Sequence, residues 1–160
     1  MDQNLKNLPL SEILDIEKLN NVDKPIEVAN GLPNECYTNN NYLAHEREKI
    51  FFNKWTVVGV GSSIPKPGDA KPYNLLGIPL ILIRGKDMKV RVFHNVCSHR
   101  GFKLLDKVCT LKNVIRCPYH SWSYDFKGNL VATPHIGGLN NHQHKNFDKT
   151  KSHLKEVRTK

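Results

Sequence analysis

The pattern of apolar and polar positions begins with a polar arm. A short helix is expected to begin at Ser11 and end at Leu19, with apolar residues forming a weak stripe along one side. Asparagine, proline and glycine residues interrupt the pattern over the next stretch, up to Pro33. We therefore expect a peripheral arm here.

A second, better supported helix is predicted over residues 42–54. Leu43, Ile50 and Phe51 are spaced to lie on one face of it, and charged residues occupy the positions between them. The asparagines at 39–41 offer caps for its first turn. This stretch is expected to lead into the main domain.

From residue 55 onward the pattern changes to short runs of β-branched and aromatic residues, separated by turn-forming residues. Glycine-containing turns at 85–87 and 125–129 each predict a hairpin. The predicted fold class is mostly β: a small antiparallel β-sandwich with a metal-binding subdomain, preceded by one or two short helices. The predicted strands are 55–60, 78–83, 90–93, 114–116, 121–124 and 130–131.

These patterns divide the 160-residue chain into four parts. They are a peripheral arm (1–30), a helical lead-in (31–54), a β domain (55–138) and a loop-like tail (139–160) whose lysine-rich end, 145–160, is expected to be frayed and solvated.

Composition excludes several classes of protein. No run of 18 apolar residues exists, so a membrane span is not expected, and the polar start lacks a secretory layout, which favours a cytoplasmic location. The net charge is +9, but no basic helix face or mixture of aromatics with arginines suggests nucleic-acid binding. An acidic redox partner is the favoured reading of this charge.

Two short boxes carry the candidate chemistry. The first is Cys97-Ser98-His99, and the second, 17 residues later, is Cys117-Pro118-Tyr119-His120. Each box follows a strand-like segment, so two loops are expected to reach over one metal centre. Thiolates hold iron beside sulfide, whereas neutral imidazoles remove negative charge and raise the reduction potential. The boxes predict one [2Fe–2S] cluster, with the two cysteines on one iron and the two histidines on the other.

The cysteines and histidines also allow other assignments. A Cys2His2 zinc site is the alternative for the boxes, but structural zinc sites seldom mix both ligand types within each box. Cys36 and Cys109 are expected to be apolar thiols rather than ligands or disulfide partners. Three late histidines lack a carboxylate at the spacing of an iron site and are expected to be loop residues: His135, His142 and His144.

The two boxes with their flanks, Asn95–Gly101 and Cys117–Tyr124, resemble the iron–sulfur domain of Rieske non-haem iron oxygenase α subunits, the aromatic-ring-hydroxylating group. The resemblance extends over residues 31–138. Respiratory Rieske proteins carry an extra cysteine in each loop, whereas this chain has Phe102 and Tyr119 there. The resemblance therefore implies the oxygenase and ferredoxin branch, with a potential near about −150 mV.

Several loop residues are candidates for positions around the cluster. Gly101 is expected to allow a tight turn, and Arg100 to orient the loop or meet the redox partner, with a solvated arginine as the alternative. Tyr119, Ser121 and Trp122 are candidate cluster neighbours, although ordinary packing is an equal possibility for the tryptophan.

The resemblance implies an electron-transfer function. Electrons are expected to pass from a reductase or ferredoxin toward a mononuclear non-haem Fe(II) in an oxygenase domain, within a mono- or dioxygenase that in the family is often a trimer. The alternative is a free-standing Rieske ferredoxin-like carrier. The family's oxygen-activating iron ligands have no counterpart in this sequence, so the chain is expected to lack that catalytic domain and to hydroxylate nothing by itself.

Overall fold

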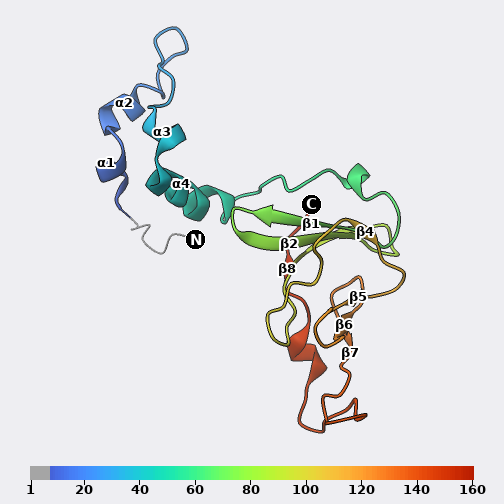
Figure 1. Ribbon diagram of the computed structural model, residues 1–160. Helices are drawn as coiled ribbons and strands as arrows, with labels where there is room; N and C mark the ends of the chain where they lie inside the picture. Colours follow the sequence, from blue (N-terminus) through green and yellow to red (C-terminus); the bar gives the residue numbers. More distant parts are fainter. Residues whose placement is uncertain (1–7) are drawn as a thin grey trace. The chain divides into compact units, whose positions relative to one another are not determined.

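The computed structural model describes residues 8–160, which belong to two compact units that divide between Val57 and Val58 (Figure 1). Each unit is described by itself below. No helix among the described residues is long and apolar enough to cross a membrane.

The first unit consists of short helical segments. The predicted helix from Ser11 to Leu19 is wrong, because Leu14 is extended and separates two helices. Asp15 begins the second of these by accepting hydrogen bonds from the backbone N–H groups of Glu17 and Lys18. The segments are α1 (Leu10–Ile13), α2 (Ile16–Asn20), α3 (Glu35–Thr38), α4 (Asn40–Glu46) and a π-helical turn (Arg47–Phe51).

The second predicted helix exists but is shorter than expected. Its cap is confirmed, since the Asn39 side chain accepts from the backbone N–H of Asn41 at 2.8 Å. After Glu46 the helix widens into the π turn and ends at Phe51. Leu43 and Ile50, predicted to lie on a common face, are 42% and 48% exposed. The spacing found the helix, but these side chains remain largely exposed in this structure.

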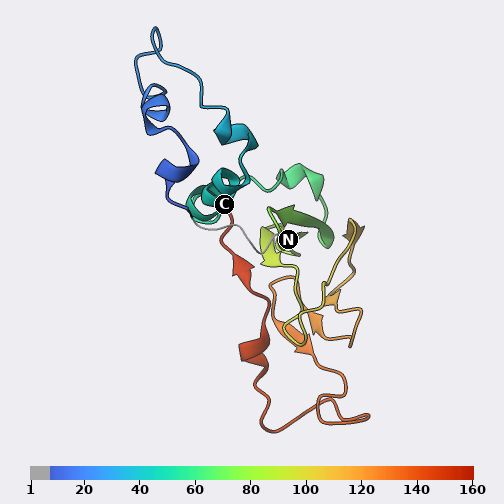
Figure 2. The same ribbon diagram turned by 60° about the vertical axis from the view of Figure 1, so that its left-hand side comes forward.

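The second unit contains two antiparallel sheets (Figures 1 and 2). The mostly β prediction and the hairpin at 85–87 are confirmed, while the predicted strand over 55–60 is wrong, since this segment is irregular. One sheet has the order β4 (Cys109–Thr110), β1 (Asp69–Leu75), β2 (Ile78–Arg84), β3 (Val90–His94) and β8 (Glu156–Val157). The other has the order β5 (Ile115–Arg116), β6 (Ser123–Tyr124) and β7 (Leu130–Ala132).

The β2 strand separates two apolar cores because its side chains alternate between the faces of the sheet. Ile81 and Ile83 join the larger core, which also contains Tyr124 of the second sheet. Leu80 and Leu82 pack on the opposite face with Ile64. The larger core includes both box cysteines, so burial of apolar side chains positions the candidate metal centre.

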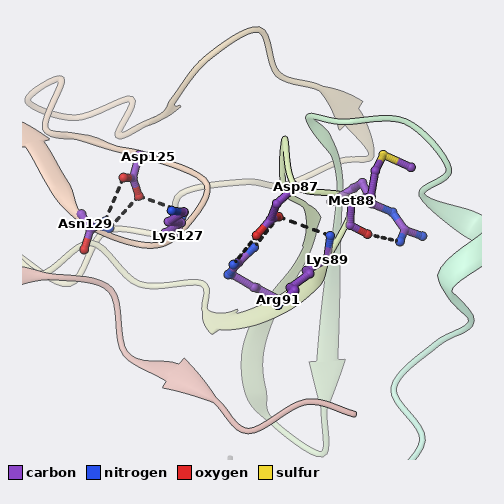
Figure 3. Close-up of polar contacts among 8 residues, drawn as sticks. Asp87, Met88, Lys89, Arg91, Asp125, Lys127 and Asn129 are labelled. Carbon is purple, nitrogen blue, oxygen red and sulfur yellow. Dashed lines mark hydrogen bonds and ion pairs between the residues drawn. The ribbon is translucent and has the colours of Figure 1, made fainter.

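Two polar turns close the hairpins (Figure 3). Arg91 donates two hydrogen bonds to the Asp87 carboxylate, at 2.8 and 2.9 Å. Asp125 accepts from the backbone N–H of Lys127 and from both the backbone and the side chain of Asn129. The turns share the lining of an open cavity of about 570 Å³, which contains none of the four predicted ligands.

The lysine-rich end of the chain was predicted to be frayed, but in the structure it packs against the β domain. A 3-10 turn, η3 (Lys149–Ser152), leads to β8, which pairs with β3. Leu154 is only 6% exposed within the larger core, and its N–H donates to the carbonyl of Gly128 at 2.9 Å. The lysine-rich composition of this stretch gave no indication that Leu154 and Phe147 pack against the core.

Candidate metal centre

The two boxes form loops with the same backbone hydrogen bonds. In the first loop the N–H of Cys97 donates to the carbonyl of Phe102 at 2.8 Å, and the N–H of Gly101 donates to the carbonyl of Cys97 at 2.9 Å. In the second loop the N–H of Cys117 donates to the carbonyl of Trp122 at 2.8 Å, and the N–H of Ser121 donates to the carbonyl of Cys117 at 3.0 Å. Two loops of different sequence therefore present their cysteines in equivalent ways.

Each loop turns through a residue with left-handed backbone geometry at the fourth position after its cysteine. Gly101 has φ 68° and Ser121 has φ 60°. A glycine adopts this geometry freely, which confirms the predicted turn at Gly101, whereas a serine pays a conformational cost there. The side chain of Ser121 offsets part of this cost by accepting a hydrogen bond from Arg116 at 2.9 Å.

The four predicted ligands meet as two pairs. Cys97 and Cys117 are 1% and 2% exposed, belong to the same apolar core, and are close enough for Cys117 to raise the pKa of Cys97. The rings of His99 and His120 are half-buried, with centroids 4.9 Å apart. Within residues 8–160 no three His, Cys, Asp or Glu side chains are grouped to hold a single ion. The arrangement thus brings a thiol pair and an imidazole pair together.

Burial shifts the pKa of one ligand in each pair, Cys97 and His99. It raises the pKa of Cys97, and the neighbouring Cys117 raises it further, while the hydrogen bond from Tyr124 acts in the opposite direction. Burial, then repulsion from His120 and Arg100, lowers the pKa of His99. A neutral imidazole is the form of histidine that binds metal, and a thiol loses its proton when it becomes a ligand.

One nitrogen of the imidazole pair lacks a partner. The Nδ1 atom of His120 is buried and makes no hydrogen bond to any described residue. A buried polar atom without a partner is costly, so native proteins rarely leave one unless a bound group satisfies it. The donor set, two thiols and two imidazoles with one unsatisfied ring nitrogen, fits an iron–sulfur cluster.

A comparison with protein families agrees with this geometry. Residues 54–143 match the family model described as the Rieske [2Fe-2S] domain. The chain belongs to the Rieske domain family. The match contains both boxes, and the family's name implies the cluster that the four side chains fit.

Several known proteins resemble this Rieske domain. It is 38% identical over 127 residues to the carnitine monooxygenase oxygenase subunit of Escherichia coli K12, covering 79% of this chain and 33% of that protein. It is 33% identical over 109 residues to the benzene 1,2-dioxygenase α subunit of Pseudomonas putida, covering 68% and 24%. The chain therefore spans about a third or less of the length of these relatives.

Solved structures give the same result. The crystal structure of the quaternary ammonium Rieske monooxygenase CntA with an inhibitor superposes with a TM-score of 0.70 at 35% identity, covering 79% of this chain and 34% of that one. Naphthalene 1,2-dioxygenase with bound indole gives a TM-score of 0.62 at 31% identity, covering 71% and 25%. The fold and its relation to Rieske oxygenases are thus confirmed.

Aromatic rings surround the histidine pair of the Rieske domain. Trp122 is buried and stacks on His99, with centroids 4.5 Å apart and planes 7° from parallel, while its other neighbour is Phe147. The ring of Tyr119 lies against the ring of His120, with centroids 3.6 Å apart, and Tyr119 is 53% exposed. Of the sequence candidates, Trp122 and Tyr119 contact predicted ligands through their side chains, whereas Gly101 and Ser121 do so through backbone hydrogen bonds.

The last candidate is Arg100. Arg100 is exposed, and no described residue bonds its side chain. Sequence reasoning missed two supporting residues, Asn95 and Phe147. The buried Asn95 side chain holds the backbone at Leu104 and Leu105 through three hydrogen bonds, but a lone asparagine before a box carried no signal of this role.

The late histidines are loop residues in this structure. His135 and His142 lie 5.1 Å apart between ring centroids, and Nδ1 of each accepts a backbone N–H. An imidazole with Nδ1 used in this way carries its proton on Nε2, which is the protonation opposite to that of an Nε2 metal ligand. Both histidines thus use Nδ1 to hold the backbone of the loop that carries them.

Proposed function

We propose that Cys97, His99, Cys117 and His120 bind one [2Fe–2S] cluster and that the chain transfers single electrons. The single observation that carries this proposal is the convergence of two like pairs, thiol with thiol and imidazole with imidazole. A cluster whose two irons have different ligands needs two cysteines grouped for one iron and two histidines grouped for the other. The unsatisfied Nδ1 of His120 is the nitrogen expected to face its iron.

The chain's own residues hold and tune this site. When bound, the cluster supplies one-electron redox chemistry at a potential that its two imidazole ligands raise. The buried thiols lose their protons on binding, while Trp122 fixes the plane of the His99 ring by stacking. Burial of the cysteines and half-exposure of the histidines give the site an insulated side and a side open to electron exchange.

The proposed role is electron delivery within an oxygenase. The relatives named above are oxygenase subunits, and the matching part of each is about a third or less of its length. We propose that the chain accepts electrons from a reductase or ferredoxin and passes them toward a mononuclear non-haem iron in an oxygenase domain. In the same proposal the full-length oxygenase is a cytoplasmic mono- or dioxygenase that forms a trimer, while the hydroxylation belongs to its oxygenase domain.

A redox titration tests the electron-transfer proposal. The protein, reconstituted anaerobically with iron and sulfide, is titrated while its visible absorption is recorded. The proposal predicts a one-electron transition near about −150 mV, toward the low end of the Rieske range. A protein that binds iron and sulfide but shows no reversible one-electron transition would overturn the role in electron transfer.

A further inference from the structure

We propose that the basic segment 149–155 is the docking surface for an acidic electron-carrier protein; this rests on the function proposed above. The segment carries Lys149, Lys151 and Lys155 and contains no carboxylate. The side chains of Lys151 and Lys155 are exposed and form no ion pair within 4 Å with a described residue, and Lys151 is close enough to Asp148, just before η3, to lower the pKa of that carboxyl. With the flanking Asp148 and Glu156, residues 148–156 contain three lysines and two carboxylates and keep a net charge of +1, which is open to a partner.

The segment is fastened to the first ligand loop. The Ser98 hydroxyl, between the two ligands of the first box, donates to the carbonyl of His153 at 3.0 Å. The N–H of His94, just before that box, donates to the carbonyl of Lys155 at 3.0 Å. In both ribbon views the red η3 turn lies beside this loop (Figures 1 and 2). A partner on the segment would thus stand next to the loop that carries Cys97 and His99.

Packing also ties the segment to the second ligand loop. Phe147, two residues before η3, lies edge-on against Trp122 with centroids 5.4 Å apart, and Trp122 in turn stacks on His99. The buried Leu154 anchors the other end. These contacts make the lysines part of a fixed surface rather than of a loose tail.

The charge around the boxes has one sign. Residues 95–103 and 115–124 contain arginine or lysine but no aspartate or glutamate. Lys103 pairs with Asp106 at 2.9 Å, which leaves Arg100 in the first ligand loop and Arg116 just before the second as the other basic residues of these two stretches. A surface of one sign attracts a partner of the opposite sign and speeds its approach. Since the surface adjoins the ligand loops, an acidic electron carrier is the partner it fits.

The test is the rate of electron transfer from a reduced plant-type ferredoxin, an acidic [2Fe–2S] protein, to the reconstituted chain in stopped flow. One electron leaves the ferredoxin, which becomes oxidised, and reduces one chain. The variant is Lys151→Glu with Lys155→Glu. The matched control is Lys86→Glu with Lys89→Glu, since these exposed lysines occupy the turn at the other end of β3.

The proposal predicts at least about a tenfold slower rate for the Lys151/Lys155 variant at low salt, less than about a twofold change for the control, and loss of the difference as ionic strength rises. Equal slowing of both variants, or slowing of neither, would overturn it. So would an oligonucleotide that binds the wild type but not the Lys151/Lys155 variant, if the electron-transfer rate is unchanged.

Visible absorption of the cluster distinguishes failure of the proposed function from failure of the proposed docking surface. A wild-type chain without cluster absorption would refute the proposed function itself, whereas intact absorption with unchanged rates refutes only the docking surface. If the charge reversal prevents folding, Lys151→Gln with Lys155→Gln replaces it, with an expected slowing of about threefold under the same salt dependence.

Discussion

The hydroxyl of Tyr124 lies 3.3 Å from the sulfur of Cys97, within the buried core beneath the first ligand loop. The same hydroxyl oxygen accepts the backbone N–H of Ser98 at 3.1 Å, which orients the tyrosine proton toward the sulfur. Burial raises the pKa of Tyr124, so it remains a donor over the whole working range of pH. Tyr124 thus connects β6 of the second sheet to the first ligand loop.

Replacing Tyr124 by phenylalanine should lower the reduction potential. A donor to a cysteine ligand stabilises the reduced, more negative state, and loss of about 1 to 2 kcal/mol of that preference corresponds to a fall of about 40 to 90 mV. Potentiometric titration measures the change. Tyr73→Phe is the control, because no described residue hydrogen-bonds the Tyr73 hydroxyl; an equal shift in both variants would contradict the assigned role.

Replacing Gly101 by alanine should destabilise the domain by about 1 to 2 kcal/mol. An added Cβ would meet nothing within 4 Å, so the whole cost comes from the left-handed backbone at φ 68°. Gly31→Ala is the matched control, since Gly31 has equal space without this geometry. Chemical denaturation measures the free energy of unfolding, and a harmless Gly101→Ala would show that the loop does not turn as described.

The sequence predicted the ligand loops better than it predicted their surroundings. The two boxes and the glycine at 101 are local signals, because spacing and backbone freedom act within a few residues. The left-handed serine at 121 and the long-range bonds of Asn95 are set by the fold around them. Likewise Leu154 docks the tail through packing with residues far away in the sequence, which composition does not reveal.

Replacing Asn95 by alanine should destabilise the domain by about 2 to 4 kcal/mol, because three hydrogen bonds are lost and buried backbone groups at Leu104 and Leu105 lose their partners. Iron release should also accelerate, as the first ligand loop loses its support. The control is Asn74→Ala, whose side chain caps an exposed turn at Gly77. If Asn95→Ala changed the unfolding free energy no more than this control, the support would be refuted.

The turn at Asp125 should make the free energy of unfolding depend on pH in the acidic range. Burial alone would raise the pKa of Asp125, but hydrogen bonds from Asn129 and Lys127 prevail and lower it. A lowered pKa in the folded state contributes stability above the unfolded value of about 3.9, and this contribution is lost as pH falls through the folded pKa. Asp125→Asn should therefore be less stable than wild type at pH 7 and approach it at low pH.

Denaturation of both proteins across this pH range checks the prediction. A difference between wild type and Asp125→Asn that stays constant down to the lowest pH would show that the carboxylate charge is not what the turn uses. Asp106→Asn, at an exposed ion pair with Lys103, should show a smaller effect that salt removes.

The central claim is that two cysteines and two histidines of this chain share one [2Fe–2S] cluster. The most direct test counts iron and acid-labile sulfide in the reconstituted protein and records pulsed EPR of its reduced state. The account predicts two irons, two sulfides and magnetic coupling to the nitrogens of two imidazoles, with one coupling lost in His120→Cys. Zinc without sulfide, or a cluster without nitrogen coupling, would contradict it.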